Sequence, residues 1–210
     1  MNIAPESLDR EASYKIVTGA VVPRPIAWVT SLTADGVVNL APFSAFTFLS
    51  SYPPILGFNV GLRDGQQKDS AANIKASGEY VVNIADDSMV EAVHDSSIAY
   101  PRDVSEVEAL GLPQARSLRV RPPRIASAPV SMECRLQQVL SFGNNGSSFI
   151  VGEVVMFHVR DAIIDNGKID SAKMRPLCRL AGPNYATLGK VITLRPVVPW
   201  KADPAPPAKT

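Results

Sequence analysis

The segment Lys68-Asp69-Ser70-Ala71-Ala72-Asn73-Ile74 holds residue types whose spacing suits the binding of an anion. It predicts the start of a helix, because Asp69 or Ser70 can cap free backbone N–H groups, alanine favours helix, and Gly78 is placed to end it. The partial positive charge of a helix start adds to the Lys68 ammonium group and to the Ser70 hydroxyl donor. Together these groups suit a phosphate monoester, so we predict a phosphorylated cofactor here.

A purely structural interpretation of the same segment is a cap on a solvated turn, and the segment alone favours that interpretation. A second stretch, Asn39-Leu40-Ala41-Pro42-Phe43-Ser44, favours the ligand site. It follows an apolar run that we expect to break at Pro42, because proline lacks a backbone N–H. Ser44 and its neighbours would then offer backbone and hydroxyl donors near the phosphate.

Further motifs follow along the first half of the chain in a fixed order. They are Arg24-Pro25-Ile26-Ala27-Trp28-Val29-Thr30-Ser31, Asp35-Gly36, the Asn39–Ser44 stretch, Pro53-Pro54, the Lys68–Ile74 segment and Gly78-Glu79-Tyr80-Val81-Val82-Asn83. In this order the chain resembles the flavin-reductase-like, FMN-binding split-barrel family, including its flavoredoxin-like members. The resemblance is strongest over residues 14–85 and continues more weakly through Gly152-Glu153-Val154-Val155 to Tyr185.

The resemblance implies that the phosphate belongs to FMN. Lys68 and Ser70 are then expected at the phosphate, and many members of the family have Thr where Ser70 stands. Two segments are expected along the ribityl chain and the isoalloxazine, and their candidate residues are Thr30, Ser31, Asn39, Ala41, Pro42, Phe43 and Ser44.

A late segment adds two candidate cofactor contacts. In reductases of this family a run with His, Gly and Tyr approaches the flavin and the nicotinamide. The comparable run here is Cys178-Arg179-Leu180-Ala181-Gly182-Pro183-Asn184-Tyr185, so Arg179 stands about where those reductases carry His. We include Arg179 and Tyr185 among the cofactor-binding candidates, although Tyr185 suits the edge of a core equally well.

Bound FMN would supply the redox chemistry itself, so no catalytic side chain is predicted. The chain has no G-x-G-x-x-G motif followed by an acidic residue, and NAD(P)H is therefore expected only as a transient co-substrate. The resemblance implies an NAD(P)H-dependent flavin reductase that supplies reduced flavin to a partner monooxygenase, and a homodimer with FMN near its interface. Two alternatives stay open: a flavoredoxin-like FMN electron carrier that exchanges electrons with another protein, and a non-catalytic FMN-binding protein.

The composition excludes several other classes. With a formal net charge of +1, the chain has no broad attraction to nucleic acid. Four arginines lie in Arg116–Arg124, but the prolines among them predict an extended connection. Neither a signal-peptide pattern nor an apolar run of the ~20 residues that span a membrane occurs, so we predict a cytoplasmic protein without membrane contact.

The cysteines and histidines give no metal or nucleophilic motif. Cys134 and Cys178 lie far apart, without a C-x-x-C pair or clustered histidines around them. Both are predicted to be buried small residues. His94 and His158 are predicted to be structural, because neither has the neighbours of a catalytic triad.

The pattern of apolar residues and turns predicts a mainly β protein. Strands are expected at 25–32, 37–41, 55–60, 80–85, 130–142 and 148–159, turns at 33–36, 143–146 and 165–168, and a helix from Asp86 to about His94. Residues 96–115 look irregular. Repeated strands with few helices predict an antiparallel β-barrel with flanking helices, and the resemblance makes this an FMN-binding split barrel of about six strands.

The 210 residues suffice for one substantial core. We expect a single domain over residues 1–195. The tail 196–210 contains five prolines, and Trp200 is the residue best suited to dock it.

Overall fold

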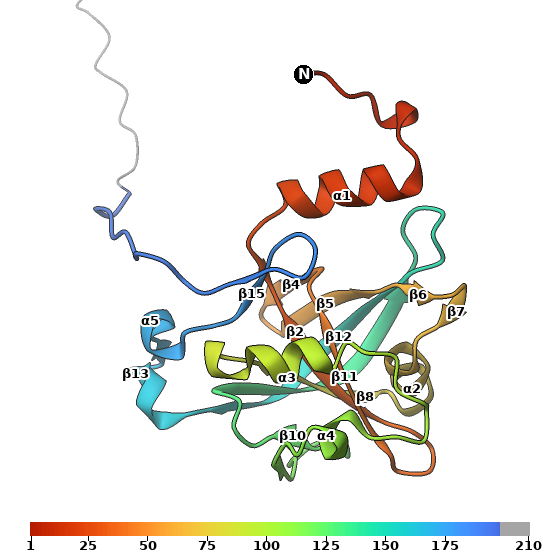
Figure 1. The fold of residues 1–210 in the computed structure, drawn as a ribbon. Helices are drawn as coiled ribbons and strands as arrows, with labels where there is room; N and C mark the ends of the chain where they lie inside the picture. The colour runs from red at the N-terminus through yellow and green to blue at the C-terminus, as the bar shows by residue number, and fades with distance from the viewer. Residues whose placement is uncertain (198–210) are drawn as a thin grey trace, which may run out of the picture.

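One antiparallel sheet of seven strands dominates the computed structural model, which describes residues 1–197 (Figure 1). The strands lie in the order β3-β2-β8-β11-β12-β5-β4. Their bounds are β2 Ala27–Leu32, β3 Val38–Phe43, β4 Phe46–Ser51, β5 Pro54–Val60, β8 Glu79–Ile84, β11 Val130–Leu140 and β12 Ser148–Val159. The mainly β, antiparallel architecture predicted from the sequence is confirmed.

The sheet does not form a closed barrel. Its edges are β3 and β4, and these two strands are not paired with each other in the described part of the chain. The sheet of the predicted split barrel is therefore not closed in the described part of the chain, and it has one strand more than the predicted number of about six. The additional strand is β4, whose side chains are mostly exposed, so it lacks the apolar alternation that marks a buried strand.

Short ribbons and helices surround the large sheet (Figure 1). The ribbon strands are β1 Arg24–Pro25, β6 Leu62–Arg63, β7 Gln66–Gln67, β9 Gln114–Ala115, β10 Arg124–Ile125, β13 Ile164–Asp165, β14 Lys168–Ile169, β15 Cys178–Arg179 and β16 Tyr185–Ala186. The α-helices are α1 Arg10–Ala20, α2 Asp69–Ser77, α3 Val90–Asp95, α4 Glu106–Ala109 and α5 Ser171–Met174, and 3₁₀ turns occupy Pro5–Ser7, Asp87–Met89 and Asp161–Ile163.

Helix α1 has no buried residue and stands apart from the sheet (Figure 1). This helix was not predicted from the sequence, and no apolar stripe of α1 faces the core. Trp200 and the rest of the predicted tail, apart from residues 196 and 197, lie outside the described residues.

The strand β2 connects the two apolar clusters of the core. Because side chains alternate along a strand, Ala27 and Val29 join one cluster while Trp28 joins the other. The indole N–H of Trp28 donates to the Ser96 hydroxyl at 2.9 Å. Helix α2 packs against β2 and β3, and α4 packs against β3. These contacts fix both helices relative to the strands that carry the candidate site.

The predicted turns are confirmed, but several predicted strand ends are wrong. The strand expected at 130–142 ends at Leu140, and the one expected at 25–32 is interrupted at Ile26. Gly36 closes the turn between β2 and β3 with a φ of 86°, and its N–H donates to the carbonyl of Thr33 at 3.1 Å. The expected break at Pro42 does not occur, because β3 continues to Phe43. β3 is an edge strand, where a proline without an N–H is tolerated.

The arginine segment forms a loop between β9 and β10 instead of an extended connection. The buried carboxylate of Glu133 holds this loop by accepting the backbone N–H groups of Leu118, Arg119 and Val120 at 2.7, 2.6 and 3.1 Å. His158 Nε2 lies 2.6 Å from the same carboxylate, so this histidine is part of the anchor. Three backbone donors explain why the segment turns back on itself.

The two cysteines differ in burial. Cys134 is buried as predicted, whereas Cys178 is only partly buried. No helix among residues 1–197 combines the length and the apolar character needed to cross a membrane.

Candidate functional site

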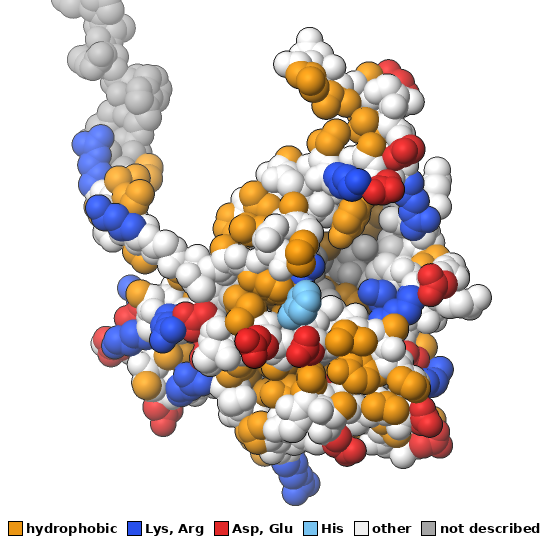
Figure 2. All heavy atoms as spheres, in the orientation of Figure 1, with side chains coloured by type: hydrophobic (Ala, Val, Ile, Leu, Met, Phe, Trp, Pro, Cys, Tyr) orange, Lys and Arg blue, Asp and Glu red, His pale blue; other side chains and the backbone are white. Residues whose placement is uncertain are grey.

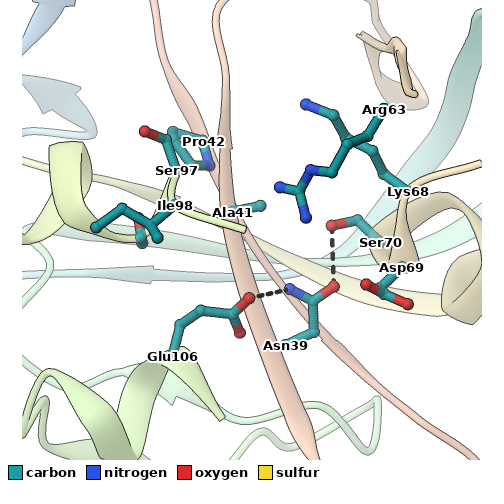
Figure 3. Close-up of a pocket in the computed structure, with 11 residues that line it drawn as sticks. Asn39, Ala41, Pro42, Arg63, Lys68, Asp69, Ser70, Ser97, Ile98 and Glu106 are labelled. Atoms are coloured by element: carbon teal, nitrogen blue, oxygen red, sulfur yellow. Dashed lines mark hydrogen bonds between the residues drawn. The ribbon is translucent and has the colours of Figure 1, made fainter. Parts of the chain in front are cut away.

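A pocket lies where the start of α2 meets β3 and β6 (Figure 3). One wall is basic and is formed by Arg63 of β6 and Lys68 at the start of α2. Burial, together with the charge of Arg63, lowers the pKa of Lys68. Two cationic groups that are close together and partly shielded from water favour an anion between them.

Helix α2 begins without a side-chain cap. Lys68 is the N-cap residue, and no side chain accepts a hydrogen bond from the first turn. The prediction that Asp69 or Ser70 caps the helix is therefore wrong. Ser70 turns instead toward β3, and the Asp69 carboxylate lies 3.9 Å from the Arg102 guanidinium. The N–H groups of Asp69 and Ser70 thus stay available to a ligand, whereas that of Ala71 donates to the Lys68 carbonyl at 3.1 Å. The predicted helix end is confirmed, since Gly78 adopts φ 71° there.

The floor of the pocket is a chain of three side chains, Ser70, Asn39 and Glu106 (Figure 3). The Ser70 hydroxyl donates to Asn39 Oδ1 at 3.1 Å. Asn39 Nδ2 donates to Glu106 Oε1 at 3.2 Å, and the Leu40 N–H donates to Glu106 Oε2 at 2.8 Å. Burial raises the pKa of Glu106, and the hydrogen bonds from Leu40 and Asn39 act in the opposite direction. The pocket therefore combines a basic wall with a buried carboxylate.

The remaining wall is partly apolar. Ala41 and Pro42 of β3, and Ser97 and Ile98, which follow α3, lie across the pocket from Arg63 and Lys68 (Figure 3). Figure 2 shows the same face of the molecule hollowed below α1, with basic side chains beside the hollow near β6. Such a mixture of small apolar groups and a few polar groups is typical of a cofactor site.

Four of the predicted flavin contacts therefore meet at one pocket together with Lys68: Ser70, Asn39, Ala41 and Pro42. Ser31 is buried beside them and accepts a hydrogen bond from Asn73 Nδ2 at 3.3 Å. The assignment of these residues to FMN stays a prediction.

Three other predicted contacts do not line this pocket. The Thr30 hydroxyl is buried and donates to the carbonyl of Pro123 at 2.6 Å. Phe43 is buried against Phe58, with 5.2 Å between ring centroids. Ser44 is partly buried and accepts a hydrogen bond of 3.4 Å from Arg24.

Arg179 and Tyr185 form a separate cluster with His94. The Arg179 guanidinium lies 4.6 Å from the centre of the Tyr185 ring and also donates to the Tyr185 hydroxyl. His94 Nδ1 lies 3.3 Å from the same hydroxyl. His94 is in the last turn of α3, and Ser97, three residues further on, lines the pocket. The cluster therefore borders the pocket along the chain.

Arg63 and Glu106 belong to the site but were not identified from the sequence. Ser105 and Glu108 carry a local helix signal, since the Ser105 hydroxyl accepts the Glu108 N–H at 3.4 Å. That signal could have located α4 within residues 96–115. It could not have shown that Glu106 reaches β3, because this contact joins residues 66 positions apart.

Comparison with known proteins identifies the family. Residues 19–174 match the model of the flavin reductase like domain. An uncharacterized protein of Halalkalibacterium halodurans is 41% identical over 204 residues, which are 94% of this chain and 98% of the relative.

Two solved structures are similar over nearly their whole lengths. Nitrilotriacetate monooxygenase component B from Bacillus cereus is 35% identical with a TM-score of 0.89, covering 92% of this chain and 98% of its own. The 2-nitrobenzoate 2-nitroreductase of Pseudomonas fluorescens is 33% identical with a TM-score of 0.86, covering 98% of this chain and 100% of its own.

The chain belongs to the flavin reductase-like family, and the resemblance found in its sequence is confirmed. Membership places it among flavin oxidoreductases.

Proposed function

We propose that this protein is an NAD(P)H-dependent flavin reductase that binds FMN and supplies reduced flavin to a partner monooxygenase. The observation that carries the proposal is the basic wall of Arg63 and Lys68 at the uncapped start of α2. The similarity to a monooxygenase component supports the role of supplier. Reduced nicotinamide is available in the cytoplasm, which is the compartment we propose.

The residues of the pocket fit a phosphorylated flavin. Lys68, Arg63 and the N–H groups of Asp69 and Ser70 would hold the phosphate, because they combine two charges with preorganised donors. Ala41 and Pro42 would offer an apolar surface next to it. When bound, the flavin supplies the capacity to accept a hydride and to release two electrons. The chain's own part is to bind the cofactor, orient it and limit access of water.

Arg179 and Tyr185 are proposed to flank the flavin on the side where NAD(P)H binds briefly. Both side chains are partly buried. Burial raises the pKa of Tyr185, while the neighbouring Arg179 acts to lower it. A tyrosine hydroxyl held by Arg179 and His94 remains a neutral hydrogen-bonding group at neutral pH, so its proposed role is positioning.

Stopped-flow reduction of the FMN-loaded protein by NADH and by NADPH tests the function, with FMN exchange measured on the same preparation. Fast reduction together with fast exchange supports a flavin reductase. Fast reduction by an electron-transfer protein but not by either nicotinamide would identify an electron carrier instead. Bound FMN that no donor reduces would identify a non-catalytic binding protein.

The similarity to a nitroreductase supplies a second candidate acceptor. If the protein reduces nitroaromatic acids itself, 2-nitrobenzoate should reoxidise the reduced protein anaerobically without added free flavin. A requirement for free flavin would favour the supplier role.

We further propose a homodimer. Helix α1 exposes 67% of Tyr14 and 56% of Val17, strand β4 exposes 72% of Phe48, and the turn that follows β4 exposes 94% of Tyr52. Apolar side chains also lie along α1 in Figure 2. Such surfaces are typical of residues covered by a second subunit. Sedimentation velocity should show twice the chain mass, and Phe48→Glu should shift the protein toward the monomer.

A further inference from the structure

The direction of each hydrogen bond on the pocket floor follows from Glu106 (Figure 3). Both oxygens of Glu106 accept, one from the Leu40 N–H and one from Asn39 Nδ2. With a donor against each of its oxygens, Glu106 acts here only as an acceptor. Asn39 must therefore present its NH₂ group to Glu106 and its oxygen to Ser70. The hydroxyl of Ser70 must then donate to Asn39, at 3.1 Å.

We infer that Glu106 is a positioning residue that keeps the Ser70 hydroxyl from donating to the flavin phosphate and so weakens FMN binding enough for exchange. The inference rests on the proposed FMN site. A phosphate dianion offers only acceptors, and in this arrangement Ser70 offers its lone pairs to the pocket. For Ser70 to donate to phosphate, Asn39 Oδ1 would lose its partner, which is costly for a buried group.

The carboxylates around the pocket also weaken anion binding, against the attraction of Arg63 and Lys68. Glu106 lies on the opposite side of Asn39 from Ser70, while Arg63 and Lys68 reach over the pocket on the Ser70 side (Figure 3). Asp69 also lines the pocket and is partly offset by Arg102 at 3.9 Å. A buried carboxylate near an anion site opposes the anion. A protein that hands reduced flavin to a partner needs such limited affinity, because tight binding slows release.

The backbone leaves Glu106 no alternative arrangement. Oε2 is held by the Leu40 N–H at 2.8 Å, and α4 is fixed against β3. Asn39 lies on β3 between Glu106 and the first turn of α2. Only a change in what Glu106 can donate would allow Asn39 to rotate its amide group by half a turn.

Glu106→Gln makes that change while keeping the shape of the side chain. The Gln oxygen can accept the Leu40 N–H, and its NH₂ group then faces Asn39. Asn39 must present its oxygen to this donor and its NH₂ group to Ser70, which frees the hydroxyl proton of Ser70. We expect FMN to bind about tenfold tighter to Glu106→Gln than to the wild-type protein. Riboflavin, which has no phosphate, should change by less than about twofold.

Coupling to Ser70 separates rotation of Asn39 from simple removal of a charge. In the wild-type background, Ser70→Ala should weaken FMN binding by less than about threefold, because the hydroxyl is directed at Asn39. The same substitution in the Glu106→Gln background should weaken FMN binding by about tenfold. Glu108→Gln is the matched control. It removes an exposed charge two residues away and should leave the affinities for FMN and riboflavin unchanged.

Isothermal titration calorimetry of the four proteins of this cycle, and of Glu108→Gln, with FMN and riboflavin is the experiment. Equal effects of Ser70→Ala in both backgrounds would overturn the inference, as would tighter riboflavin binding in Glu106→Gln. If Glu106→Gln does not fold, Ser70→Ala in the wild-type background decides alone: a loss of tenfold or more refutes the inference. Wild-type protein that binds riboflavin and FMN equally would refute the phosphate site of the proposed function and, with it, this inference.

Discussion

Glu106 and Glu133 are both buried carboxylates that accept backbone N–H groups, but they are held in opposite ways. Desolvation acts to raise the pKa of both. At Glu133 the N–H groups of Leu118 and Arg119 and the bond from His158 outweigh it, and the pKa is lowered. At Glu106 the N–H groups of Leu40 and of Glu106 itself and the Asn39 amide do not outweigh desolvation, to which the Asp69 charge adds, and the pKa is raised.

The difference in pKa matches a difference in role: Glu133 anchors a loop, and Glu106 lines the candidate site. Glu133 has enough donors to hold its charge without cost, and it fixes a loop that carries no predicted ligand contact. Glu106 has fewer donors and lines the pocket with Lys68 and Asp69. A buried charge that is incompletely satisfied costs stability, and such groups concentrate at functional sites. The two carboxylates thus predict different responses to the same kind of substitution.

The largest effect is expected at the anchor. Glu133→Ala leaves three backbone N–H groups without an acceptor and His158 without its carboxylate. We expect the free energy of unfolding to fall by about 3–5 kcal/mol. Urea unfolding followed by circular dichroism measures it, with the exposed Glu108→Ala as control. A loss below about 1 kcal/mol would mean that water satisfies the loop and that Glu133 is no anchor.

An intermediate effect is expected in the pocket, on binding. Lys68→Ala removes a charge-assisted hydrogen bond to the proposed phosphate, worth about 1.5–3 kcal/mol, so FMN should bind ten- to a hundredfold more weakly. Lys75→Ala, on the same helix but outside the pocket lining, is the control. Fluorescence titration measures both. A similar loss of riboflavin affinity would show that Lys68 supports the fold instead of the phosphate.

The smallest effect is expected in how stability depends on pH. The pKa of Glu106 is raised above ~4.3, the pKa of Glu in the unfolded chain. The contribution of Glu106 to stability therefore falls as the pH rises from ~4.3 through its pKa in the folded protein. The pKa of Glu133 is lowered, so its contribution to stability is present above about pH 4.3. That contribution is lost as the pH falls through the pKa of Glu133 in the folded protein. Glu106→Gln should therefore gain stability relative to wild type as the pH rises above ~4.3, by less than about 1 kcal/mol. Urea unfolding across this range measures the difference, and a difference independent of pH would contradict the raised pKa.

Much of the sheet could be predicted because its signals are local. β5 and β8 contain apolar runs at 54–58 and 80–82, and the turn at Gly36 requires a positive φ. The strand β4 and helix α1 were missed because their apolar side chains remain exposed in the single chain. Whether the sheet closes depends on pairing between β3 and β4, which no local pattern encodes.

The site was predicted in part for the same reason. Lys68 and Ser70 were found because helix starts have a sequence signature. The role of Ser70 as a cap was wrong, because its hydroxyl is taken by Asn39 on a strand 31 residues earlier. Glu106 was missed because its partners become visible only when α4 packs on β3.

Calorimetric titration of the wild-type protein with FMN and riboflavin tests the central claim that the pocket at α2 holds a flavin phosphate. The two ligands differ only in the group that Arg63, Lys68 and the first turn of α2 are proposed to bind. Two or more charge-assisted contacts predict that FMN binds at least about a hundredfold more tightly than riboflavin. Equal affinities for the two ligands would contradict the account.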